Sequence, residues 1–107
     1  MNKLPKRFKE RWIKALLSGK YKQGRGYLYE PTTECYCALG VAGDVLGVPK
    51  TQLSYTCTLD NFLLTKEPIP GQLMHTGLGS IANKIATFND QKYRSFRWIA
   101  YYIKRYL

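Results

Sequence analysis

Residues 35–49, CYCALGVAGDVLGVP, are small and apolar almost throughout, and they predict a buried helix at the centre of the fold. The positions that suit the inside of such a helix are 37, 38, 41, 42, 45 and 46. Gly47 suits the C-terminal cap, and Pro49 lies just beyond it, where a helix does not continue. Gly40 and Gly43 would each weaken an exposed helix by about 1 kcal/mol. We therefore expect a neighbouring element to pack closely against both glycines.

Amphipathic helices are predicted at the two ends of the chain. Near the start, Pro5 suits a first helical turn and Ser18-Gly19 suits a stop, which predicts a helix from about residue 5 to 17. Near the end, Ser95 suits the N-cap of a helix over 96–107. The apolar stripe of the first helix is Leu4, Phe8, Trp12 and Leu16, and that of the last helix is Phe96, Ile99, Ala100, Ile103 and Leu107.

The segments between these helices give weaker signals. Residues 27–29 and 35–36 are expected to pair as a short β-hairpin, because turn-forming residues separate two short extended pieces. Ser80 suits the N-cap of a helix that ends at Phe88. A short helix is expected at 71–77 and a polar loop at 89–94.

The composition favours a folded domain and argues against several classes of protein. With 107 residues, 45% of them apolar, the chain can offset the entropy of ordering by burial. We expect one compact domain over residues 1–107, mainly α (α+β) with a minor β-hairpin. No apolar run approaches the roughly 20 residues that span a membrane, and MNKLPKRFKERW is charged where a signal peptide is apolar. A cytoplasmic protein with no membrane partner is therefore expected.

The cysteine content predicts neither disulfides nor a metal site. The chain has three cysteines, an odd number, and a single histidine. Their spacing does not match the two separated ligand pairs of a structural zinc site. We expect reduced thiols, no metal and no cofactor.

The positive charge is concentrated at the ends of the chain. Residues 1–26 carry nine Lys and Arg against one acid, and residues 91–107 carry five against none. Residues 27–90 carry three against six, so the middle of the chain is mildly acidic. If the two ends lie side by side, as is common in small domains, their cations would merge into one surface that attracts polyanions.

Two basic segments, the loop SGKYKQGRGYLY (18–29) and the last helix, are expected to form one binding site. On the last helix, three cations and a tyrosine share a face, and Trp98 and Tyr102 lie at its edges. Cations attract phosphates, and aromatic rings between them can stack on bases. The predicted phosphate- and ligand-binding residues are Lys20, Tyr21, Lys22, Gln23, Arg25, Arg97, Tyr101, Lys104 and Arg105. The expected partner is nucleic acid or a nucleotide; the alternative is an acidic surface of a host protein.

The glycines of the 18–29 loop leave two interpretations open. Gly19, Gly24 and Gly26 would let backbone N–H groups point into a concavity that holds an anion. The order of residues is not that of a Walker P-loop, and a turn that merely carries lysines is the alternative. Asp44, inside the central apolar helix, is expected to pair with a basic residue of this loop.

A thiol hydrolase is the second alternative for the function. Cys37 at a helix start, followed by His75 and then Asn89 or Asp90, has the chain order of papain-like hydrolases. The flanking residues match no such family, and cysteine is commonly buried. Asn89 and Asp90 are equally suited to a loop or capping role that satisfies backbone donors before the final helix.

Three segments carry a resemblance to a known family: WIKALLSGKYKQGRGYL (12–28), CYCALGVAGDV (35–45) and FNDQKYRSFRWIAYYI (88–103), with IPGQLMHTGL (69–78) between the last two. In this order they resemble small uncharacterised proteins of bacteriophages and bacterial genomes. The family-like positions are Tyr21, Gln23, Cys37, Leu39, Gly40, Val41, Asp44, Asn89 and Asp90. The resemblance implies a phage or prophage origin and a bacterial cytoplasm, and it suits a protein that counters a host defence. It implies no activity, and its pattern has no histidine at the place of His75.

Overall fold

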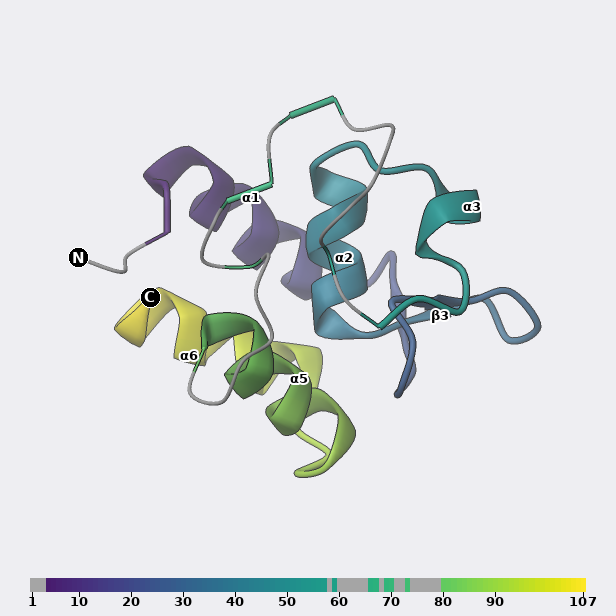
Figure 1. Cartoon of the computed structure of the whole chain (residues 1–107). Helices are drawn as coiled ribbons and strands as arrows, with labels where there is room; N and C mark the ends of the chain where they lie inside the picture. Colours follow the sequence, from purple (N-terminus) through teal and green to yellow (C-terminus); the bar gives the residue numbers. More distant parts are fainter. Residues whose placement is uncertain (1–3, 58, 60–65, 68, 71–72, 74–79) are drawn as a thin grey trace.

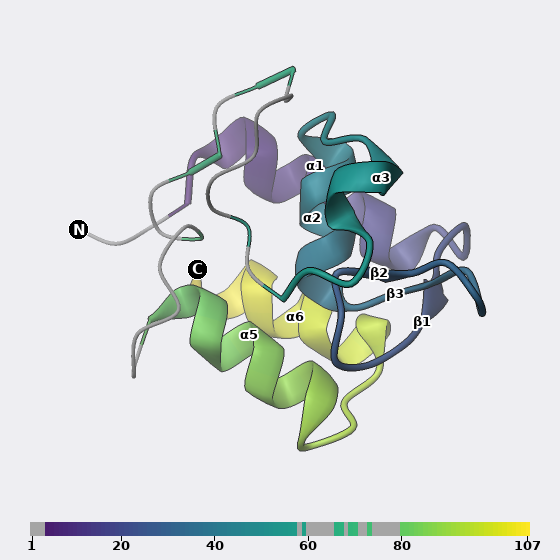
Figure 2. The ribbon, with the colours of Figure 1, turned by 45° about the vertical axis from the view of Figure 1, so that its right-hand side comes forward.

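The computed structural model describes residues 4–57, 59, 66–67, 69–70, 73 and 80–107. The fold is mainly α with a small β-sheet, which confirms the predicted class (Figures 1 and 2). Its elements are α1 (Lys6–Leu17), β1 (Lys22–Gln23), β2 (Tyr29–Glu30), β3 (Cys35–Tyr36), α2 (Ala38–Val45), α3 (Lys50–Leu53), α5 (Ile81–Asp90) and α6 (Phe96–Tyr106). Among the described residues, no helix combines the length and the apolar character that crossing a bilayer requires.

The first and last helices pack against each other. The two basic ends of the chain therefore lie side by side, which is the condition for their cations to form one surface. α1 and α6 run antiparallel, so that the start of one lies beside the end of the other (Figure 1). The backbone N–H of Leu4 donates to the carbonyl of Leu107 at 3.2 Å. The predicted apolar stripes of both helices are buried, with Trp12 and Ile103 completely inaccessible to solvent. Burial of these stripes, rather than helix propensity, holds the two helices together.

α2 is the buried helix at the centre of the fold, as predicted. Every residue from Ala38 to Gly43 is buried, and α1 and α5 both contact this helix. Gly40 lies against the backbone of Leu28, so closely that a Cβ atom would meet the Leu28 carbonyl oxygen at 1.7 Å. Gly47, with φ +85°, terminates the helix in the left-handed conformation that glycine favours. The expected close packing against the glycines is therefore confirmed.

The two later helices begin at the predicted caps. The hydroxyl of Ser80 accepts from the N–H of Asn83 at 3.0 Å, and that of Ser95 accepts from the N–H of Trp98 at 3.1 Å. α5 continues to Asp90, so the prediction that a polar loop begins at Asn89 is wrong. The reason is tertiary: the Asn89 side chain is buried and hydrogen-bonded to other segments. Of the helix predicted at 71–77, the structure describes Leu73 alone, which is helical and buried; the other positions, including His75, lie outside the described residues.

The hairpin prediction is confirmed, and a third strand was missed. β2 and β3 pair antiparallel, with Tyr29 opposite Tyr36 and Glu30 opposite Cys35. β1 adds to the other edge of β3 in parallel, with Lys22 opposite Cys35. Part of the expected 18–29 loop is thus a short strand. Two residues carry too little sequence pattern to predict such a strand, which depends on its pairing with β3.

Candidate functional site

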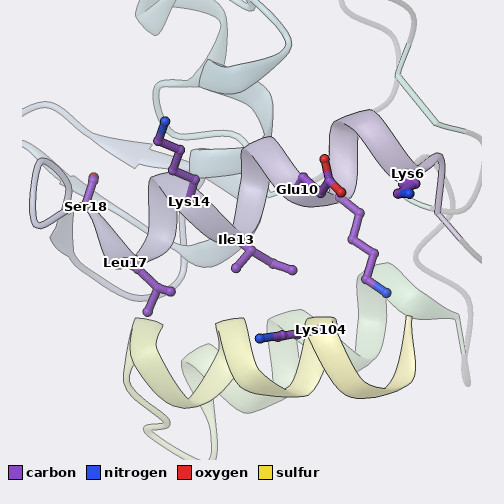
Figure 3. A pocket seen from close by; sticks show the side chains of 8 residues that line it. Lys6, Glu10, Ile13, Lys14, Leu17, Ser18 and Lys104 are labelled. Atoms are coloured by element: carbon purple, nitrogen blue, oxygen red, sulfur yellow. The ribbon is translucent and has the colours of Figure 1, made fainter.

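A groove of about 710 Å³ lies between α1 and α6 (Figure 3). We call it the terminal groove; the described residues that line it are Lys6, Lys9, Glu10, Ile13, Lys14, Leu17, Ser18 and Lys104. Figure 3 shows Ile13 and Leu17 pointing from α1 toward α6, on which Lys104 lies. The groove therefore has an apolar floor and ammonium groups around it. Three of these lysines are on α1 and one, Lys104, is on α6, so the first and the last helix both contribute cations.

The charge of the terminal groove is not neutralised. Its four lysines form no ion pair with any acid that the structure describes, and Glu10 is the one acid among the described lining residues. Arg11, on the same helix, is different: its guanidinium binds the carboxylate of Glu67 and donates to the carbonyl of Val45 at 2.7 Å. Arg11 therefore helps to hold the fold, while the groove lysines remain available to a partner.

Two smaller hollows continue from the terminal groove to the segment around β1. The first, the bridging hollow of about 370 Å³, is lined by Arg11, Lys14, Ala15, Ser18, Lys20, Tyr21 and Val45. The second, the tyrosine hollow of about 330 Å³, is lined by Lys20, Tyr21, Lys22, Tyr29, Thr33, Glu34, Tyr36 and Lys50. The bridging hollow shares Lys14 with the groove and Lys20 with the tyrosine hollow. Lysines therefore line three neighbouring hollows that share lining residues.

Three arginines are stacked on aromatic rings. The guanidinium carbon lies 4.5 Å from the ring centroid of Tyr93 for Arg25, 4.6 Å from that of Trp98 for Arg94, and 5.7 Å from that of Tyr106 for Arg105. Such stacking fixes the plane of the guanidinium and leaves its N–H edge free for phosphate or carboxylate. Arg94 was not predicted, because it precedes the Ser95 cap of α6 and helical spacing therefore does not relate it to Trp98.

The structure places the predicted site residues in different surroundings. Lys20, Tyr21 and Lys22 line the tyrosine hollow, and Lys104 lines the terminal groove. The other predicted residues of α6 are exposed: Arg97, Tyr101 and Arg105. By helical periodicity, Arg97 and Tyr101 lie on the same side of α6 as Lys104. Sequence reasoning left out the groove residues of α1, although their amphipathic pattern was visible: Lys6, Lys9, Ile13, Lys14 and Leu17.

Gln23 is occupied by the protein itself. Its side-chain Nε2 donates to Asn89 Oδ1 and to the carbonyl of Arg94, both at 2.8 Å, and its Oε1 accepts from the N–H of Phe96 at 3.1 Å. These bonds attach β1 to the corner between α5 and α6. The side chain therefore positions the basic loop and has little capacity left for a ligand.

Tyr21 and Asp44 bind each other. The Tyr21 hydroxyl donates to Asp44 Oδ2 at 2.5 Å, and its ring packs edge-on against Tyr36. Burial, together with this carboxylate, raises the pKa of Tyr21. The prediction that Asp44 pairs with a basic residue of the loop is thus wrong: a neutral phenol of that loop satisfies the carboxylate. Tyr21 is half-buried and in contact with Tyr36, so its ring is less available for stacking on a base than the prediction assumed.

The backbone of the glycine-rich loop is also largely satisfied. The N–H of Gly24 donates to the carbonyl of Tyr36 at 2.7 Å, and the N–H of Gly26 donates to Asp90 Oδ1 at 3.1 Å. The N–H of Lys20 donates to the Ser18 hydroxyl at 3.2 Å. With these donors used, a turn that carries lysines describes the loop better than an anion-binding nest does.

Cys37 caps α2 and is held as a thiol. Its sulfur accepts from the N–H of Gly40 at 3.4 Å, and the side chain is buried. Burial raises the pKa of Cys37 to about 12, far above neutral pH, so the nucleophilic thiolate is scarce. His75 lies outside the described residues, and within the described part of the chain no three His, Cys, Asp or Glu side chains are grouped to hold a metal. The geometry around Cys37 fits a structural role better than catalysis.

We predict that thiol reagents distinguish the cysteines. At about pH 8, an aromatic disulfide reagent should label the exposed Cys57 rapidly, and the buried Cys35 and Cys37 only after unfolding. The absorbance of the released thiolate counts the reacted groups with time. The Cys57→Ser variant should lose the rapid phase. Rapid labelling of Cys37 in that variant would contradict its structural role and favour the hydrolase.

The fold and surface define a small helical protein with a basic face whose groove lysines form no ion pair with the described acids. The chain belongs to the family described as a domain of unknown function (DUF8296), whose model matches residues 4–60, from the start of α1 to beyond α3. This confirms membership of an uncharacterised family, and the closing segment 88–103 of the resemblance lies beyond the match. No curated protein and no solved structure matches the chain.

Proposed function

We propose that the protein binds nucleic acid, without catalysis, over the surface formed by α1, the segment around β1 and α6. The observation that carries this proposal is the terminal groove, which is lined by lysines from both ends of the chain that form no ion pair with any described acid. Of the two phosphate-rich partners expected from the sequence, a strand of nucleic acid suits the neighbouring hollows better than one nucleotide does. A strand presents a phosphate at each nucleotide along that series of lysines.

Phosphate contacts of this kind predict a steep dependence of affinity on salt. Each phosphate neutralised by a lysine releases condensed counterions, with a slope of about −0.7 in log K against log salt for a single strand. The four lysines of the terminal groove would therefore contribute a slope of about −3. The stacked arginines and the exposed Tyr101 of α6 add contacts that are less sensitive to salt.

The charge-reversal variant Lys9→Glu/Lys104→Glu is expected to weaken binding of a labelled oligonucleotide by about 10- to 100-fold at about 50 mM salt. One of these lysines comes from each helix of the terminal groove. Fluorescence anisotropy measures the affinity, and repeating the titration at several salt concentrations should show a shallower slope for the variant.

Lys84→Glu is the control for overall charge. Lys84 is exposed on α5 and lines none of the three hollows, so its reversal should change affinity much less. Because the main variant reverses two charges, Lys84 is compared with each single reversal, Lys9→Glu and Lys104→Glu. Equal losses from all three would attribute binding to net charge alone. No binding of any oligonucleotide at this salt would contradict the proposed function.

The apolar floor of the groove supports a second candidate, an inhibitor that docks on an acidic host protein. Leu17 is 54% exposed, and Ile13 beside it points into the same space. An apolar floor with a cationic rim complements an acidic amphipathic surface. What copurifies from a bacterial lysate distinguishes the candidates: nucleic acid supports the first, and one host polypeptide in a fixed ratio supports the second.

The biological setting is part of the same proposal. The resemblance found in the sequence supports a phage-encoded protein that acts in the host cytoplasm. A protein that occupies nucleic acid or a nucleotide signal there would counter a host defence. Loss of phage protection on deletion of the gene, restored by the wild type and not by Lys9→Glu/Lys104→Glu, would support this setting.

A further inference from the structure

Two mostly buried tyrosines line the tyrosine hollow, and no described residue binds the hydroxyl group of either. Tyr29 and Tyr36 face each other across β2 and β3, with ring centroids 4.7 Å apart, and both are 6% exposed. Both side chains line the hollow. In the part of the chain that the structure describes, neither hydroxyl has a hydrogen-bond partner, whereas the hydroxyl of Tyr21 binds Asp44. Hydroxyl groups that line a hollow and are not bound by the described residues are available to a ligand there.

Cations surround these hydroxyls. Lys20 and Lys22 approach from β1 and the residues before it, and Lys50 approaches from the start of α3. The ammonium of Lys50 lies 5.5 Å from the ring centroid of Tyr29. Glu34 is the one acid among the described lining residues, so the hollow is positive overall.

The Tyr36 hydroxyl supplies a donor at neutral pH. Burial, and to a lesser extent the nearby charges of Asp44 and Glu34, raises the pKa of Tyr36 to about 12. The phenol therefore keeps its proton under physiological conditions and can donate it. Ammonium groups donate only, so the hollow offers many donors and few acceptors. Its chemical complement is an oxyanion with several acceptor oxygens.

We propose that the tyrosine hollow binds a phosphate monoester, held by the ammonium groups of Lys20, Lys22 and Lys50 and by the hydroxyls of Tyr29 and Tyr36. A monoester carries up to two charges and three free oxygens, which matches three cations and two neutral donors better than the single charge of a phosphodiester. The volume of about 330 Å³ is at the small end of the range for ligand pockets and suits one nucleotide.

The inference rests on the proposed function for the source of its ligand. The monoester is either the 5′-terminal phosphate of a bound strand or the phosphate of a free mononucleotide. The hollow adjoins the bridging hollow at Lys20, and the bridging hollow adjoins the terminal groove at Lys14. A strand anchored by its terminal phosphate could therefore continue along the lysines toward α6.

The test compares one labelled oligonucleotide with a 5′-phosphate and with a 5′-hydroxyl. For the wild type, the phosphate should raise affinity by about tenfold, since a charge-assisted set of hydrogen bonds is added. Tyr36→Phe and Lys50→Ala should each remove most of this gain. Tyr27→Phe is the matched control, because it deletes a tyrosine hydroxyl outside the hollow and should preserve the gain.

Thermal unfolding of Tyr36→Phe separates ligand binding from folding. The variant removes a hydroxyl that no described residue binds, so its Tm should equal or exceed that of the wild type. If Tyr36→Phe nevertheless fails to fold, the exposed Lys50→Ala carries the test alone. A lowered Tm together with an unchanged gain from the 5′-phosphate would overturn the inference.

The remaining outcomes distinguish this inference from the proposed function. Equal affinity for the two oligonucleotides, with no binding of adenosine monophosphate in calorimetry, overturns the inference and leaves nucleic-acid binding intact. Binding of adenosine monophosphate that Tyr36→Phe and Lys50→Ala abolish, without binding of any strand, supports the inference and overturns the proposed function. Higher affinity for the 5′-phosphorylated oligonucleotide, without binding of the mononucleotide, supports the inference and identifies the end of a strand as the source of the phosphate.

Discussion

Gly40→Ala is expected to destabilise the protein more than any of the other single substitutions proposed. A methyl group at this position would lie 1.7 Å from the Leu28 carbonyl oxygen and 2.6 Å from its carbonyl carbon. Both are backbone atoms, so no side-chain rotation relieves the contact, and the same carbonyl accepts from the N–H of Cys37. Overpacking costs about 1–3 kcal/mol where side chains can adjust, so we expect at least about 4 kcal/mol here. This cost is a large part of the free energy of unfolding of a small domain, which is typically about 5–15 kcal/mol.

Urea unfolding followed by circular dichroism measures this loss. Gly19→Ala is the matched control, because a Cβ atom there meets no atom within 4 Å. Its φ of +78° still makes alanine unfavourable, by about 1–2 kcal/mol. If Gly40→Ala costs no more than Gly19→Ala, then α2 does not approach Leu28 as closely as the structure indicates.

The helices were predictable because their signals are local. The apolar stripes of α1 and α6, the serine caps of α5 and α6, and the glycine stop of α2 each depend on residues within a few positions of one another. The two-residue strand β1 and the four-residue helix α3 were missed. Elements this short have too few residues for a periodic pattern, and contacts with distant segments determine them.

The candidate site was predictable in charge and not in detail. The surplus of cations at both ends indicated a basic face, and the meeting of Leu4 with Leu107 brings those ends together. The tyrosine hollow could not be predicted, because it requires the register that places Tyr29 opposite Tyr36. It also requires Lys50, which comes from a helix that the sequence did not indicate. Side chains that meet only through tertiary pairing leave no local pattern.

Asn89→Leu is expected to lower the free energy of unfolding by about 3 kcal/mol, an effect second in size to that of Gly40→Ala. Asn89 is fully buried; its Oδ1 accepts from Gln23 Nε2 at 2.8 Å and from the Ala38 N–H at 3.2 Å. Its Nδ2 donates to the carbonyl of Gly24 and to Asp90 Oδ1, both at 2.8 Å. Leucine has a similar size, so it creates little cavity but leaves the buried Ala38 donor and the partly buried Gly24 acceptor without these partners.

The same substitution at Asn83 isolates the contribution of this hydrogen-bond network. Asn83 is on the same helix, and its backbone N–H donates to the Ser80 hydroxyl. Its side chain makes no hydrogen bond with any described residue. Asn83→Leu should therefore change the free energy of unfolding by less than about 0.5 kcal/mol. Urea unfolding of both variants compares their free energies of unfolding.

Hydrogen exchange tests the effect of Asn89 on β1. Because Asn89 also binds Gln23 and Gly24, its loss should loosen β1, which includes Lys22. Hydrogen exchange should therefore speed up at the Gly24 amide in Asn89→Leu and stay unchanged in Asn83→Leu. Equal destabilisation by the two variants would mean that the cost comes from placing leucine on α5 rather than from losing the bonds that connect α5, α2 and β1.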